Sequence, residues 1–108
     1  LPEVAMKDIL LALMDVFKRV EMNASHQVHI DALSVREKMT HILDSVQDKD
    51  HIAFTSLFDV NEGRLGVVVT FLAMLELLKQ HMIEFVQAAP FAPIYLKPKV
   101  IQTESAVV

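Results

Sequence analysis

The chain has 108 residues, of which 53% are hydrophobic, and a formal net charge of −4. This acidic balance argues against a general nucleic-acid binder, because neutralising phosphates requires clustered lysine and arginine side chains. The absence of cysteine excludes disulfide scaffolds and thiolate metal sites. A domain this small cannot bury so much apolar surface, so we expect part of that surface to contact a partner.

No signal-peptide pattern opens the chain. Its longest uncharged apolar run, Leu65 to Leu75, is well short of the roughly 18 residues that a membrane-spanning helix needs. We therefore expect a soluble protein.

The first expected element is an amphipathic helix over residues 1–22, where apolar residues recur at three- and four-residue spacing. Its apolar stripe could fold back on the rest of the chain, lie in the groove of a partner or drive a homodimer, and the pattern leaves these alternatives open. The stripe consists of Ile9, Leu13, Phe17 and Val20. The following HQVHI alternates and predicts a short strand or an extended connector.

Five further elements are expected after Ser34. Ser34 and Glu37 form a capping box, and Thr55 is a good N-cap. The run GRLGVVVTFLAMLELLKQ starts with valines that favour a strand, but its length predicts a helix. The expected elements are a helix over 34–46, a strand over 52–54, a short helix after Thr55, a long helix over 64–80, and a hairpin of strands 82–87 and 94–97.

This order is that of a winged-helix domain. The predicted fold class is therefore mainly α with a small β-hairpin, and an amphipathic helix precedes the winged helix. The expected division is a partner-binding helix and connector over 1–33, the winged helix over 34–98 and a flexible tail over 99–108, which shows no periodicity.

Most winged helices bind DNA, through the third helix and the hairpin. Here Thr70 is the only polar residue between Arg64 and Glu76, and the hairpin tip reads AAPFAP. Because base edges are read by polar side chains and phosphates by basic ones, a DNA-binding transcriptional regulator is the less favoured alternative. The apolar hairpin instead favours a protein partner.

Within the hairpin, Ile94 and Leu96 have two possible roles. They could contact that partner or merely pack on the long helix. Tyr95 lies on the opposite face of its strand, and Phe91 lies on the connecting loop. Tyr95 and Phe91 are therefore the better interface candidates, as aromatic anchors beside a strand edge open to β-augmentation.

Catalytic, cofactor and metal sites are not expected. If the connector is a strand, His26 and His29 point to opposite faces, which prevents shared ligation. With only two glycines, the chain has no glycine-rich phosphate loop, and it has no nucleophile-elbow pattern. The sequence therefore predicts a protein that is not an enzyme.

The segments SVREKMTHILDSV, IAFTSLFD and RLGVVVTFLAMLELLKQ, followed by a Glu-bearing strand and an IYL strand, resemble the C-terminal region of the segregation and condensation protein A family, the bacterial kleisins. The helix LPEVAMKDILLALMDVFKRVE resembles the central helix of that family. The resemblance runs from Leu1 to about Lys97, whereas HQVHIDAL and the tail have no clear counterpart.

The resemblance implies a C-terminal piece of a longer kleisin, without the N-terminal helical domain. Its winged helix would dock on the ATPase head of an SMC protein, with Phe91, Ile94, Tyr95 and Leu96 as candidate contacts. The segment 1–33 would contact segregation and condensation protein B through Ile9, Leu13, Phe17 and Val20. Such a protein works in the cytoplasm at the nucleoid, bridges SMC heads during chromosome condensation and segregation, and contacts DNA only through the complex.

Overall fold

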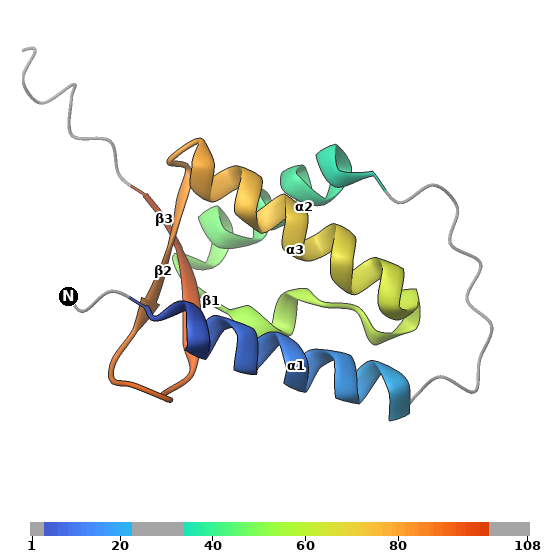
Figure 1. Ribbon diagram of the computed structural model, residues 1–108. Coiled ribbons are helices and arrows are strands. Elements are labelled where there is room, and N and C mark those ends of the chain that lie inside the picture. Colours follow the sequence, from blue (N-terminus) through green and yellow to red (C-terminus); the bar gives the residue numbers. More distant parts are fainter. Residues whose placement is uncertain (1–3, 23–33, 100–108) are drawn as a thin grey trace, which may run out of the picture.

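The computed structural model describes residues 4–22 and 34–99 of the chain. This part is mainly helical and carries a small three-stranded antiparallel sheet (Figure 1). The elements are α1 (Met6–Met22), α2 (Val35–Lys49), β1 (Ile52–Ala53), the 3-10 helices η1 (Phe54–Leu57) and η2 (Val60–Glu62), α3 (Gly63–Lys79), β2 (Ile83–Gln87) and β3 (Ile94–Pro98). The predicted order of helix, short strand, short helix, long helix and hairpin is confirmed. The HQVHI connector and residues 100–108 lie outside the described residues.

Helix α2 begins at the predicted cap, where the backbone N–H of Glu37 donates a hydrogen bond to Oγ of Ser34 at 3.2 Å. It continues past the predicted end at Val46 to Lys49 and stops at Asp50, which has a left-handed φ of 68°. The residues past the predicted end, 47–49, are exposed. The predicted end was wrong because glutamine and lysine are good helix formers where they face water.

Thr55 is not the N-cap that the sequence predicts. The 3-10 helix η1 begins one residue earlier, at Phe54, and its capping position is held by Ala53 without a side-chain hydrogen bond. The hydroxyl that closes this turn is that of Ser56, which donates to the carbonyl of Ala53 at 2.8 Å. Because Phe54 is fully buried, packing of its ring decides where the turn begins.

The ring of Phe54 lies at the centre of an aromatic group. It makes edge contacts with the rings of Phe58, Phe71 and Phe85, at centroid distances of 5.1, 6.3 and 5.8 Å. These residues come from the loop after η1, from α3 and from β2. One buried ring therefore joins the short helix, the long helix and the hairpin.

Residues 63–79 form a helix over their whole length, which confirms the prediction over the strand preference of the valines. Gly63, with φ 71°, leads the chain from η2 into α3, and glycine takes this conformation without a steric cost. Lys38 of α2 holds both carboxylate oxygens of Glu62 at 2.7 Å, just before α3. The buried residues of α3 are Gly66, Val67, Val69, Thr70, Ala73, Met74 and Leu77.

The sheet has the order β1-β3-β2, with both pairings antiparallel. Because successive residues of a strand point to opposite faces, its register separates an inner and an outer face. Leu96 pairs with Phe85 on the inner face, whereas Tyr95 pairs with Val86 on the outer face.

Helix α1 packs on the rest of the molecule. Ile9, Val16 and Val20 are buried in the same core cluster as residues of α2, α3 and the sheet. In Figure 1, α1 extends from the hairpin toward the start of α3. At that end, Arg64 pairs with Glu21. Of the alternatives that the sequence left open for the stripe, the structure shows the folded-back one.

Within the residues that the structure describes, no helix combines the length and the apolar character needed to span a membrane.

Candidate protein-binding site

The β2–β3 hairpin divides the four predicted head-contact residues into two pairs. Ile94 and Leu96 point inward and are 5% and 0% exposed, so their packing role is the one that the structure shows. Tyr95 is partly exposed on the outer face, and Phe91 lies on the loop at the hairpin tip, residues 88–93, with 70% of its surface exposed. Of these four residues, only Tyr95 and Phe91 have side chains that are open to solvent.

The outer face of the sheet forms a depression of about 490 Å³. Its walls include Val86 and the tip residues Ala92 and Pro93. The ring of Tyr95 meets the ring of His51 edge-on, with centroids 5.5 Å apart. Since the cavity is open and largely apolar, it suits a side chain or strand of another protein better than a phosphate group.

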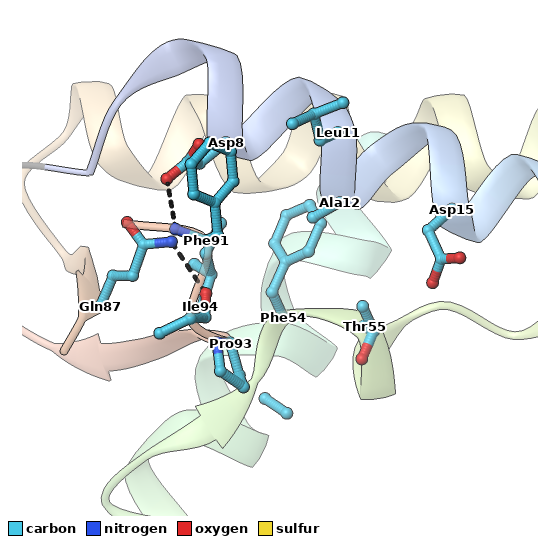
Figure 2. Close-up of a pocket in the computed structure, with 12 residues that line it drawn as sticks. Asp8, Leu11, Ala12, Asp15, Phe54, Thr55, Gln87, Phe91, Pro93 and Ile94 are labelled. Atoms are coloured by element: carbon cyan, nitrogen blue, oxygen red, sulfur yellow. Dashed lines mark hydrogen bonds between the residues drawn. The ribbon is translucent and has the colours of Figure 1, made fainter. Parts of the chain in front are cut away.

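At the hairpin tip, Phe91 has a left-handed φ of 67°. Its backbone N–H donates to Oδ2 of Asp8 in α1 at 3.0 Å, as Figure 2 shows. Beside it, Nε2 of Gln87 donates to the carbonyl of Ala92 at 2.8 Å. The Nζ of Lys7 lies 5.3 Å from the centre of the Phe91 ring, within range of a cation–π contact. The tip is therefore tied both to its own strand and to α1.

A second cavity, of about 300 Å³, lies between α1 and the hairpin tip (Figure 2). Leu11 and Ala12 of α1 face Phe54 and Pro93 across it, and Asp8 lines one side. Asp8 is only 5% exposed, and its Oδ1 has no hydrogen-bond partner among the described residues. A buried carboxylate that is only half satisfied is costly, which makes this contact unusual in the fold.

The residues predicted to contact an accessory protein face the domain. Ile9 and Val20 are 7% and 3% exposed, and Leu13 and Phe17 pack partly buried against the same core. The exposed apolar residues of α1 are instead Met6, Leu10, Leu11 and Met14. Since α1 is apolar on more than one face, spacing alone could not indicate which face meets the domain.

Helix α3 carries an exposed apolar stripe, which was not predicted from the sequence. Its members are 39–52% exposed, and they are Leu65, Val68, Leu72 and Leu75. The signal was present, because these residues recur at three- and four-residue spacing. Thr70, the one polar residue between Arg64 and Glu76, is fully buried. The outward face of α3 therefore offers no polar group for reading base edges over this stretch.

Potential metal ligands do not gather in the part of the chain that the structure describes, where no group of three or more histidine, cysteine or carboxylate residues could hold an ion. His41, His51 and His81 are exposed and belong to different segments. His26 and His29 lie outside the described residues.

Comparison with known proteins identifies close relatives. Residues 3–98 match the family described as "Segregation and condensation protein ScpA". The chain is 50% identical over 96 residues to segregation and condensation protein A of Xylella fastidiosa (strain 9a5c), covering 89% of the chain and 32% of that protein. It is 47% identical over 98 residues to the protein of the same name from Coxiella burnetii, covering 91% of the chain and 37% of that protein.

A more distant relative, segregation and condensation protein A of Myxococcus xanthus, is 32% identical over 100 residues, which cover 91% of the chain and 35% of that protein. The chain thus spans about a third of the length of these curated relatives. Its placement in their C-terminal region stays a prediction. The match over nearly the whole chain shows that this protein belongs to the segregation and condensation protein A family.

Proposed function

We propose that this chain is the docking domain of a kleisin, a non-catalytic subunit that joins the ATPase head of an SMC protein and bridges the SMC complex during chromosome condensation and segregation. Family membership supports this role. We further propose that residues 34–98 form a winged helix whose wing is the β2–β3 hairpin. The element order and the three-stranded sheet support that assignment.

The observation that carries the docking proposal is the exposed aromatic ring at the wing tip. Phe91 is 70% exposed, although hydrogen bonds hold its own backbone N–H and the carbonyl of the next residue, Ala92. Large aromatic side chains that are exposed on a fixed backbone are typical anchors of protein interfaces. Tyr95 and the apolar depression on the outer face of the sheet belong to the same hairpin, next to the tip residues Ala92 and Pro93. We propose that the SMC head contacts Phe91 and Tyr95 directly, while Ile94 and Leu96 hold the wing in shape from inside.

The open edge of β2 adds a possible backbone contact. In the sheet order β1-β3-β2, strand β2 is paired on one side only among the residues that the structure describes. A strand of the SMC head could pair with this edge by β-augmentation, and Phe91 and Tyr95 would then provide the specificity.

We also propose that segregation and condensation protein B contacts α1. Because Ile9 and Val20 hold α1 on the domain, the surface open to this partner is the exposed face that carries Met6, Leu10 and Met14. Methionine-rich apolar faces adapt well to partner surfaces.

Direct DNA binding is not part of the proposal. The hairpin tip is apolar, and the outward face of α3 carries leucine and valine between Arg64 and Glu76. We propose that DNA is contacted only through the assembled complex.

The test is a pull-down of the chain with an SMC head domain, with and without ATP. We expect Phe91→Asp and Tyr95→Asp each to abolish binding, because a charge placed in an apolar interface loses its hydration. Circular dichroism and the melting temperature should stay close to those of the unmodified chain, since neither side chain belongs to the buried core.

Leu72→Asp is the matched control, as Leu72 is an exposed apolar residue on α3, 47% exposed. It should bind the head normally. If both wing variants bind and Leu72→Asp does not, the contact surface lies on α3 and the wing proposal is wrong.

A further inference from the structure

The wing tip has a conformation that its own sequence does not favour. Phe91 has a φ of 67°, a left-handed conformation that costs free energy for any residue with a side chain and especially for a bulky one. Its ring is 70% exposed, so burial within this chain does little to offset that cost. Something else must hold the tip in this shape.

The contact that holds the hairpin tip comes from α1, which is far from the tip in the sequence. Oδ2 of Asp8 accepts the hydrogen bond of the Phe91 N–H at 3.0 Å, and the neighbouring Lys7 lies over the ring. Asp8 is itself held at a cost, because Oδ1 is buried without a partner among the described residues. Two unfavourable features thus meet at a single contact, and such strain persists where it serves a function.

We propose that Asp8 is a positioning residue of the head-binding site: its carboxylate holds the Phe91 backbone so that the ring is presented in one orientation before a partner arrives. Helix α1 is then part of that site, although only the wing touches the SMC head. A preorganised anchor binds more tightly because less conformational freedom is lost on association. The binding half of this inference rests on the proposed function, whereas the conformational half concerns the free chain alone.

The alternative to this proposal is a simpler role for Asp8 within α1. It lies in the first turn of α1, where a carboxylate interacts favourably with the helix dipole. That role would affect the stability of α1 but would not require a bond to Phe91. The two roles can be distinguished by replacing Asp8: only the positioning role predicts a change in the backbone conformation of Phe91.

The first experiment uses NMR on the free 108-residue chain. A left-handed φ gives a strong intraresidue HN–Hα NOE, and a hydrogen-bonded amide exchanges slowly. We expect Asp8→Ala to lose the NOE at Phe91 and to speed exchange of its amide by about tenfold, the effect of losing one hydrogen bond. Asp8→Asn keeps an oxygen acceptor, so it should keep both signals despite losing the charge.

Asp15→Ala is the matched control, because Asp15 lines the same cavity but is exposed. It should leave both signals unchanged. Asp8→Ser, whose hydroxyl is too short to reach the Phe91 N–H, is a second variant in case Asp8→Ala folds poorly, and it should behave like Asp8→Ala. If both variants fold and keep the NOE and the slow exchange, the proposal is overturned.

The second experiment is a double-mutant cycle with an SMC head domain as the probe. We expect Asp8→Ala to weaken binding about fivefold, Asp8→Asn less than about twofold, and Phe91→Ala to cost less in the Asp8→Ala background than alone. Additive effects would show that Asp8 does not act through Phe91. If the unmodified chain does not bind the head, the proposed function fails, and the NMR comparison still decides the role of Asp8.

Discussion

The β2–β3 hairpin and helix α3 both combine a buried apolar face with an exposed apolar face, yet they differ in what supports the exposed side. At the hairpin, the exposed Phe91 is held by Asp8 through its backbone and lies beneath Lys7. On α3, the exposed stripe around Leu72 consists of side chains on a regular helix, and within residues 4–22 and 34–99 no side chain of another element forms a hydrogen bond with the stripe. Of the two, only the hairpin uses contacts from a distant segment to fix the position of an exposed ring.

An apolar residue can be exposed for two different reasons, and this difference distinguishes them. A small domain has too little polar surface to cover itself, so scattered exposed leucines are ordinary. An exposed ring that is held in a strained backbone conformation needs another reason, and binding is the one that we propose. We make three predictions about stability. They concern the buried face of the hairpin, the packing of α1 on the domain, and the buried face of α3.

The largest effect is expected inside the hairpin. Leu96 is 0% exposed in the central strand of the sheet, so Leu96→Ala should lower the free energy of unfolding by about 2–5 kcal/mol. Urea unfolding measures this loss. Tyr95→Ala on the outer face should cost clearly less. An equal cost for both variants would mean that the two faces are not divided as described.

An intermediate effect is expected where α1 meets the core. Val16 is 1% exposed, and Val16→Ala removes two buried methyl groups, which should cost about 2 kcal/mol in thermal or urea unfolding. Met14→Ala, at a position that is 65% exposed, should change stability by no more than about 0.5 kcal/mol. If Val16→Ala proves neutral, α1 is not held on the domain and cannot brace the wing tip.

The smallest predicted effect is a gain in stability, and it concerns a buried residue of α3. Oγ1 of Thr70 is buried without a hydrogen-bond partner among the described residues. Thr70→Val replaces that hydroxyl with a methyl group of similar shape, so it should stabilise the protein by about 1 kcal/mol. For a domain of this size, that raises the melting temperature by about 4–8 °C. A lower melting temperature would show that the hydroxyl has a partner.

Much of the fold was predictable from residues 34–98. The spacing of apolar residues, the capping box and the turn residues indicated α2, α3 and the hairpin. The alternation along β3 placed Tyr95 on the opposite face from Ile94 and Leu96. The errors were local: α2 runs on to Lys49, and η1 begins at Phe54 rather than after Thr55. In the first case polar residues extend a helix in water, and in the second a buried ring decides where the turn begins.

Less of the candidate site was predictable. The sequence indicated Phe91 and Tyr95 as exposed aromatics, but it could not show that Ile9 and Val20 are buried in the core of this chain. It also contained the stripe of α3 without showing which of its apolar faces is covered. Helical spacing assigns residues to a face of their own helix, whereas the neighbour of that face depends on how the helices pack.

By itself, the sequence determined the order of the elements, the absence of charge at the hairpin tip and the family to which the chain belongs, because these properties follow from local patterns. Only the tertiary structure decided that α1 folds back on the domain and that Asp8 meets Phe91, 83 residues further along the chain. The physical reason is that such a contact has no periodic signature. It exists because burial of Ile9, Val16 and Val20 brings the first turn of α1 to the hairpin tip.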